Sequence, residues 1–121
     1  MASNNWHDEP QEHDFPAAAD YLSLLYPEEL ANTLADKLRA GTTVKKKAKD
    51  ILRASGLPLL PKDNKHVEED IDKVKEGKKL SPILLVRDTK LVIADGYHRV
   101  CAIYYLSEDL EIPCRITDRS R

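Results

Sequence analysis

The segment Asp95-Gly96-Tyr97-His98-Arg99 holds the residue types in this sequence that are best suited to chemistry. An apolar run, Leu91-Val92-Ile93-Ala94, precedes it and a helical pattern follows, so a strand-to-helix turn is predicted. The first amides of a helix lack intrahelical acceptors and carry partial positive charge, which suits an anion. Arg99 adds planar paired donors that match phosphate oxygens, and His98 can donate a hydrogen bond or carry a proton near neutral pH. The turn therefore predicts a phosphate-binding site.

The residues of this turn also admit an interpretation without a ligand. Gly96 stands between a strand and a helix, where the absence of a side chain is expected to let a ligand approach the backbone. Asp95 repels a phosphate unless it binds a metal, caps the helix or accepts a proton from a substrate hydroxyl. The alternative is that Asp95 only caps the helix, Arg99 pairs with a nearby Glu, and His98 is a partly buried histidine without a ligand.

Composition limits the setting in which such a site works. The chain has 121 residues, of which 41% are hydrophobic, so one compact domain is expected. Charged residues make up 33%, but the net charge is only -2, so no global field draws the chain to DNA or a membrane. Cys101 and Cys114 lack the paired spacing of a zinc or dithiol site. With no signal-peptide pattern at the N-terminus, a reduced, cytoplasmic location is predicted.

The N-terminal part is predicted to be a loose tail followed by a helical layer. Residues 1–15 are polar and lack apolar periodicity, so they are expected to be disordered. Residues 16–56 are expected to form helices near 16–25, 27–40 and 44–54. The second helix carries Leu30, Leu34 and Leu38 on one stripe and is expected to end in a left-handed cap at Gly41.

The third of these helices is expected to be capped by Thr43. Its inner face would consist of apolar residues at helical spacing, namely Val44, Ala48, Ile51 and Leu52. The lysines at 45–47 would then begin its outer face.

Residues 57–121 are predicted to form the core that positions the turn. Prolines bracket the apolar segment 57–61, which is therefore an edge strand or an extended passage. A helix from Asn64 to about Glu76 follows, then a hairpin of strands at 81–87 and 91–94. A helix from Gly96 to about Glu108 and a strand at 112–116 complete the pattern. The fold class is α+β, a small mixed sheet with packed helices and an N-terminal helical extension.

The stretch from about Leu57 to Ile116 resembles the ParB/sulfiredoxin superfamily. The resemblance rests on three motifs, which are Ser81-Pro82-Ile83-Leu84-Leu85-Val86, Ile93-Ala94-Asp95-Gly96-Tyr97-His98-Arg99 and Ile112-Pro113. That superfamily includes partition proteins that bind CTP, sulfiredoxins that bind ATP, a free-serine kinase and domains labelled as nucleases. Their shared use of the turn implies a nucleotide-binding role here, with ATP or CTP and Mg²⁺ as the expected cofactors.

Individual residues match the sulfiredoxin pattern unequally. Gly96, His98 and Arg99 match the Gly, His and Arg of its Gly-Gly-Cys-His-Arg turn, whereas Tyr97 stands in place of the reactive cysteine. This difference argues against sulfinic acid reduction, which needs a thiolate nucleophile. The resemblance also implies phosphate contacts from the preceding helix, at positions occupied here by His66, Glu69 and Lys73. His66 and Lys73 remain suitable as weaker candidates, and a solvated charged helix face is the alternative.

These observations define the candidate site and its competing functions. The predicted catalytic residues are Asp95 and His98, and the predicted nucleotide or phosphate contacts are Gly96, Tyr97, His98, Arg99, His66 and Lys73. The leading hypothesis is a phosphoryl-transfer or NTP-hydrolysing enzyme. The alternatives are a non-catalytic nucleotide-switched or DNA-associated module and a ParB-like nuclease. The expected partner is a nucleotide or phosphorylated small molecule, and specific DNA binding is not expected.

Overall fold

Five helices and four strands make up the computed structural model of this chain, which describes residues 5–119. The chain is an α+β protein. Its elements follow in the order α1 (Asp14–Leu22), α2 (Glu28–Ala40), β1 (Val44–Lys47), α3 (Ala48–Ser55), α4 (Lys65–Lys75), β2 (Ile83–Arg87), β3 (Leu91–Asp95), α5 (Tyr97–Leu106) and β4 (Glu111–Asp118). The helix at 64–76, the hairpin, the helix after Gly96 and the last strand are confirmed within a few residues.

The four strands form one mixed sheet in the order β1-β4-β2-β3. The hairpin partners β2 and β3 are antiparallel, β4 lies parallel to β2, and β1 pairs antiparallel with β4. The central strand β2 is buried on both faces because its side chains alternate between two cores. Ile83 and Leu85 belong to one core, whereas Leu84 and Val86 belong to the other.

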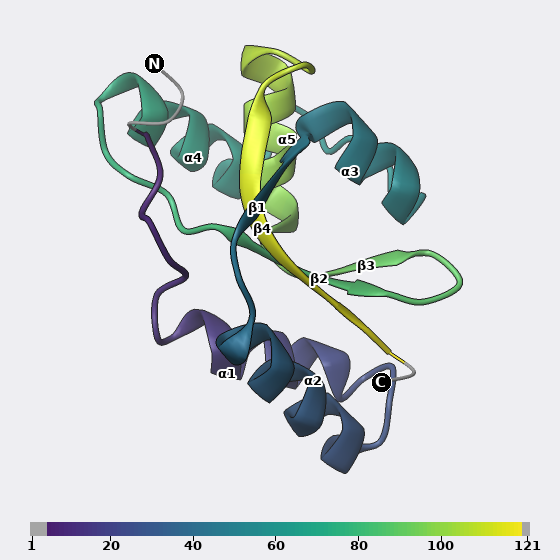
Figure 1. Cartoon of the computed structure of the whole chain (residues 1–121). Helices are drawn as coiled ribbons and strands as arrows, with labels where there is room; N and C mark the ends of the chain where they lie inside the picture. Colours follow the sequence, from purple (N-terminus) through teal and green to yellow (C-terminus); the bar gives the residue numbers. More distant parts are fainter. Residues whose placement is uncertain (1–4, 120–121) are drawn as a thin grey trace.

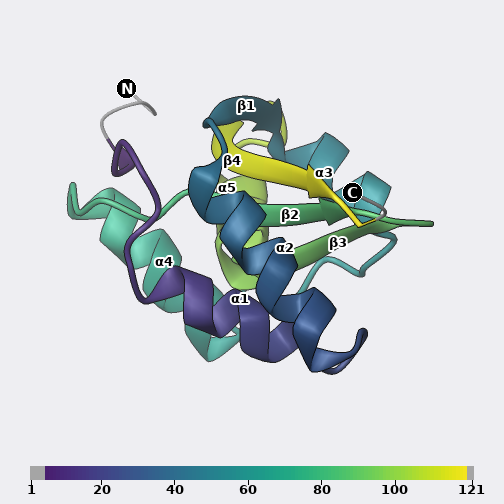
Figure 2. The same cartoon turned by 60° about the horizontal axis from the view of Figure 1, so that its bottom comes forward.

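Helices cover both faces of this sheet (Figure 1). The helices α3, α4 and α5 lie on one face, and α1 and α2 lie on the opposite face (Figures 1 and 2). The stripe on α2 faces the sheet as expected, since Leu34 and Leu38 are fully buried and Leu30 packs at the edge of their cluster. Because β3 is an edge strand, the turn that follows it lies at the sheet edge, where α4 packs against α5 and α1 packs against β3.

The helix expected at 44–54 is partly wrong, because its first turn is a strand. Residues 44–47 form β1, and α3 begins only at Ala48. Lys46 lies opposite Ile112 in the β1–β4 ladder, so the pairing satisfies backbone groups that a helix would otherwise bond internally. Val44 is exposed, while Ala48, Ile51 and Leu52 face the core as expected. The three lysines protect an exposed sheet edge, a common use of lysine.

The end of α2 also differs from the expectation. Gly41 has φ -78 and ψ 177, which is extended backbone and not a left-handed cap. The last carbonyls of α2 are instead satisfied by Arg115 of β4, whose guanidinium donates to Leu38 O at 3.1 Å and Arg39 O at 2.7 Å. Arg115 Nε donates to Thr43 Oγ1 at 3.3 Å, so Thr43 does not cap a helix.

The expected loose tail is wrong for residues 5–15, and residues 1–4 lie outside the described part of the chain. Trp6 is only 5% exposed and belongs to the same core cluster as Ile83. It forms a parallel bridge with Leu80, flanked by the hydrogen bonds His7 N to Leu80 O at 2.8 Å and Leu80 N to Asn5 O at 2.7 Å. Burial of a tryptophan offsets the entropy of ordering this polar segment.

None of the helices within residues 5–119 is long and apolar enough to cross a membrane.

Candidate functional site

The predicted turn opens onto a cavity of about 370 Å³ between α5, α4 and the start of α1. This volume falls in the usual range of small-molecule sites, about 300–1,000 Å³. The cavity is lined by His13, Asp14, Ala17, His66, Glu69, Asp70, Lys73, Asp95, Gly96, His98 and Arg99. All of the predicted site residues except Tyr97 line it, including the two weaker candidates on α4.

Tyr97 contributes to a different part of the structure. Its hydroxyl donates a hydrogen bond to Pro58 O at 2.6 Å, and Tyr105 does the same to Leu60 O at 2.6 Å. The two tyrosines thus hold the segment 57–61 against α5 as an extended passage. The prediction that the Tyr97 side chain contacts the ligand is not supported by its position.

The backbone conformation at position 96 and the close packing around it both favour glycine. Its φ of 114 is a conformation that residues with a side chain rarely adopt. A Cβ added there would overlap Ile83 Cδ1 and would lie 2.9 Å from Arg99 Nη2. A side chain at position 96 would therefore strain this turn. The immediate cause is the closeness of Ile83 in β2 and of Arg99, which differs from the ligand approach expected from sequence.

Arg99 and Asp95 form an ion pair at the N-terminus of α5. Arg99 Nη2 donates to Asp95 Oδ2 at 2.7 Å, and the two side chains are 14% and 22% exposed. Burial raises the pKa of Asp95, and the charge and hydrogen bond of Arg99 oppose that shift. Since Gly96 is the N-cap of α5, Asp95 orients the guanidinium and does not cap the helix. The alternative interpretation expected Arg99 to pair with a nearby Glu, whereas its partner is Asp95.

The guanidinium keeps donors beyond those that Asp95 uses. Among the described residues, Arg99 Nε is buried and has no hydrogen-bond partner. A buried donor without an acceptor is costly. The Arg99 side chain is thus held at the cavity by its ion pair with Asp95, while its Nε, which solvent does not reach, lacks an acceptor.

Two histidines from different helices meet at the cavity. The rings of His66 on α4 and His98 on α5 have centroids 4.9 Å apart. Burial lowers the pKa of His98, and the neighbouring His66 ring lowers it further. His98 is therefore neutral near pH 7 and can accept a proton. His66 Nδ1 also lies 3.5 Å from Glu69 Oε1 on the same helix.

The structure adds acidic residues that the sequence analysis did not select. Asp70 is half-buried in the cavity, and burial raises its pKa, opposed chiefly by Arg99 and Lys73. Its spacing from His66 and Lys73 places all three on one helix face, a signal that could have identified it. His13 and Asp14 reach the cavity from α1, and nothing in the spacing of the sequence linked them to the turn.

The cavity carries more negative than positive side chains. Four carboxylates line it, from Asp14, Glu69, Asp70 and Asp95, against the two cations of Lys73 and Arg99. A polyphosphate bound here requires a counter-cation or protonation of a carboxylate. Within residues 5–119, no three His, Cys, Asp or Glu side chains are grouped closely enough to hold a metal ion by themselves.

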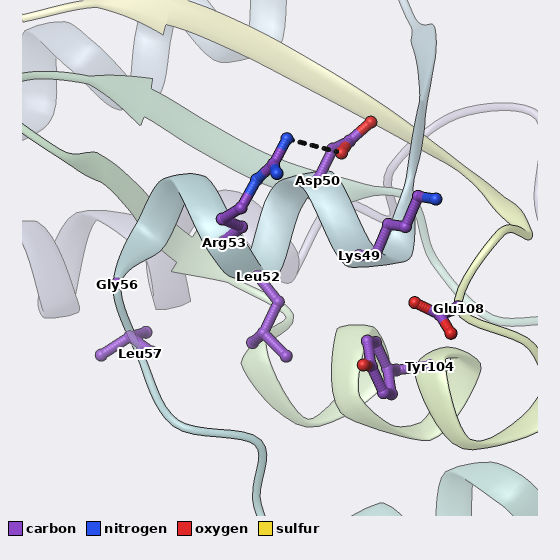
Figure 3. Close-up of a pocket in the computed structure, with 8 residues that line it drawn as sticks. All are labelled: Lys49, Asp50, Leu52, Arg53, Gly56, Leu57, Tyr104 and Glu108. Carbon is purple, nitrogen blue, oxygen red and sulfur yellow. Dashed lines mark hydrogen bonds and ion pairs between the residues drawn. The ribbon is translucent and has the colours of Figure 1, made fainter.

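A second hollow, of about 680 Å³, lies between α3 and α5 (Figure 3). Lys49 and Arg53 stand at its rim, and Leu52 and Tyr104 lie on its walls (Figure 3). Each rim cation has a carboxylate partner, because Lys49 Nζ lies 2.8 Å from Asp109 and Arg53 Nη2 lies 3.5 Å from Asp50. This hollow is larger than the cavity at Gly96 but has no histidine in its lining. The first turn of α3 borders it, and the amides of Ala48 and Lys49 there already donate to Leu110 O and Glu108 O.

Comparisons of this chain with protein-family models, curated proteins and solved structures found no match.

Proposed function

We propose that this chain is a ParB/sulfiredoxin-like nucleotide-binding protein that holds the phosphates of ATP or CTP in the cavity beside Gly96. The main support for the proposal is that groups from two helices distant in sequence meet in one cavity. Arg99 and the first amides of α5 meet Lys73, His66 and His98 in one cavity, although α4 and α5 are separated in sequence by the whole β2–β3 hairpin. Charge-assisted hydrogen bonds contribute about 1.5–3 kcal/mol each, so three or more from Arg99, His98 and the amides together would support micromolar binding.

The carboxylates favour a nucleotide bound together with Mg²⁺. The protein alone offers no grouped set of three ligands among its described residues, which fits an ion held mainly by phosphate oxygens and one or two carboxylates. Asp70 is the carboxylate placed to fill that role, since Asp95 is engaged by Arg99. When bound, the ion would neutralise phosphate charge, which the excess of carboxylates in the cavity otherwise opposes.

The proposed chemistry is phosphoryl transfer or NTP hydrolysis. Such reactions depend chiefly on positioning and charge neutralisation. In this proposal His98, neutral near pH 7, accepts the proton of the attacking hydroxyl or water, and Asp95 keeps the Arg99 guanidinium aimed at the phosphates. The assignment of proton transfer to His98 over Asp95 follows from the ion pair, which engages the Asp95 carboxylate.

Binding is tested with a thermal-shift panel of nucleotides in the presence of Mg²⁺. A ligand at one hundred times its dissociation constant should stabilise the protein by about 2.7 kcal/mol. Arg99→Gln is expected to abolish the shift. Arg53→Gln, an exposed arginine at the second hollow, is the matched control and should preserve it. An equal shift in both variants, or no shift with any nucleotide, would refute the proposed site.

Catalysis is tested separately, by release of inorganic phosphate. His98→Gln should abolish turnover while the nucleotide-induced thermal shift persists. Binding without turnover by the wild-type protein would instead favour the non-catalytic, nucleotide-switched alternative.

Metal-dependent nuclease activity is the second candidate function, and the four cavity carboxylates are the observation that favours it. Nicking of supercoiled plasmid in Mg²⁺ or Mn²⁺ that is lost in Asp70→Asn would support it. The nucleotide hypothesis is preferred because no three of these groups cluster around one point in the described structure.

A further inference from the structure

The end of α1 presents three large apolar side chains to solvent. Leu24 is 80% exposed, Leu25 is 49% exposed and Tyr21 is 42% exposed. Helical hydrogen bonds continue through this turn, since Leu24 N donates to Tyr21 O at 3.0 Å and Leu25 N donates to Leu22 O at 3.0 Å. The spacing i, i+3, i+4 therefore places the three side chains on one face, the leucine turn. Single exposed leucines are common, but a contiguous set marks an interaction surface.

The leucine turn is held rigidly from beneath. Leu22 is fully buried, and the Tyr26 hydroxyl donates to Asp88 Oδ2 of the β2–β3 connection at 2.6 Å. Figure 2 shows this turn at the end of α1 that points away from α4, so it is separate from the cavity at Gly96. A partner binding here would meet a preformed surface and would order few groups.

Acidic side chains surround the leucine turn. A hollow of about 420 Å³ next to it is lined by Ala19, Asp20, Ser23, Glu28 and Asn32. Asp20 precedes Leu24 by one helical turn, so its carboxylate lies beside the apolar face. The first Lys or Arg in the sequence is Lys37, so none of the residues from Asn5 through the first two turns of α2 supplies either cation. Arg119 reaches Tyr26 from the other end of the chain, but it lies beside the carboxylate of Asp88. The carboxylates of Asp20 and Glu28 therefore favour cations in the hollow beside the leucine turn.

We propose that the leucine turn is a docking site for a basic amphipathic segment of another polypeptide. The apolar face of that segment would cover Leu24, Leu25 and Tyr21. Its Lys or Arg heads would reach the carboxylates of Asp20 and Glu28 in the adjacent hollow. Charge complementarity identifies the partner as basic, and the exposed leucines require that it also be apolar on one side. This inference is independent of the nucleotide proposal.

Binding is tested with a fluorescent synthetic helical peptide whose two faces carry Leu and Lys. Its anisotropy should rise saturably with the full-length protein, whereas the same peptide with Glu in place of Lys should not bind. The double variant Leu24→Ser/Leu25→Ser is expected to weaken binding roughly tenfold or more, because two leucines lose apolar contact. Leu57→Ser, at an exposed leucine near the second hollow, is the matched control and should bind as wild type.

The role of charge is tested with a second pair of variants. Asp20→Asn/Glu28→Gln should weaken binding and reduce its salt dependence, whereas Glu68→Gln/Asp72→Asn on the exposed face of α4 should not. Equal binding by both pairs, or unchanged binding by the serine variant, would mean non-specific attraction and would overturn the proposal. Self-association in sedimentation equilibrium that Leu24→Ser/Leu25→Ser abolishes would also overturn it, because the occupant would then be a second copy of this chain.

Discussion

At the scale of single residues, the candidate site is dominated by groups whose ionisation is shifted by burial. Asp70 and Asp95 have raised pKa values, and His98 has a lowered one, all with desolvation as the largest cause. A lowered pKa keeps His98 neutral, and the raised values make the two carboxylates easier to protonate than exposed aspartates. Shifts of this kind, gathered in one cavity, are typical of sites that handle protons.

His98 should therefore make stability depend on pH. Its folded-state pKa lies below the ordinary value of 6.5, so its contribution is present above that value and is lost as the pH falls through the folded pKa. We expect NMR titration to find the lowered pKa, and His66→Gln to raise it because the neighbouring ring is gone. In His98→Gln, the part of the acid-induced loss of stability that comes from protonation of His98 should disappear. A pKa for His98 at or above 6.5 would contradict the environment described here.

Gly96 should be the least replaceable glycine. Gly96→Ala combines an unfavourable positive φ with overlap against Ile83 and should lower the free energy of unfolding by about 2–4 kcal/mol. Gly77→Ala is the control, because Gly77 also has positive φ but no atom lies within 4 Å of the added Cβ. It should cost only about 1 kcal/mol. Urea denaturation of both variants measures the difference, and equal costs would show that packing at Gly96 is not decisive.

At the scale of elements, side chains of one element bond to the backbone of another that is distant in sequence. The carboxyl end of α2 is capped by Arg115 of β4, and the segment between α3 and α4 is held by the hydroxyls of Tyr97 and Tyr105. Arg115 joins β4 to the end of α2, and the two tyrosines join α5 to the segment that leads into α4. None of these three side chains lines the cavity at Gly96.

Arg115 should accordingly matter more for stability than its charge suggests. Arg115→Met leaves Leu38 O and Arg39 O without this donor and should cost about 1–3 kcal/mol, measured by urea denaturation. Arg119→Met, at a half-exposed arginine on the same end of the chain, should change stability by less than about 1 kcal/mol. Hydrogen exchange at the last turn of α2 should quicken only in the first variant. Equal effects of the two substitutions would refute the capping role.

At the scale of the whole molecule, the N-terminal segment closes one of the two cores. Trp6 lies in the cluster formed by α3, α4 and α5, while α1 and α2 cover the other face of the sheet. Residues 5–13 thus cross from one face to the other and pass the edge where the cavity opens. Ser81 Oγ donates to Gln11 Oε1 at 2.6 Å, and this bond holds residues 5–13 near the start of β2.

Trp6→Ala should therefore destabilise the whole domain. Truncating a buried tryptophan costs about 3–5 kcal/mol, a large share of the roughly 5–15 kcal/mol that stabilises an ordinary domain. The urea midpoint should fall strongly, and Trp6 fluorescence, from the single tryptophan, should shift to longer wavelength when wild type unfolds. Trp6→Phe should recover much of the loss. An unchanged midpoint in Trp6→Ala would mean that this segment is not part of the core.

The elements that sequence reasoning located correctly are those with strong local signals. The apolar runs 83–86 and 91–94, the Asn64 cap and the change of period after Gly96 are local, so they predict the hairpin, α4 and α5, and with them the turn. The residues His66 and Lys73 were placed at the cavity only through the family resemblance. Local periodicity carries no information about which helices meet.

Tertiary contacts determine the features that local sequence signals did not predict. Val44–Lys47 is a strand because β4 offers backbone partners, although its three lysines show no strand pattern. Trp6 is ordered because its indole packs into the core between the sheet and helices α3 to α5 and its backbone pairs with Leu80. Asp14 reaches the cavity because α1 packs beside β3. Each depends on surfaces that exist only once the chain has folded, since pairing and burial are shared between residues far apart in sequence.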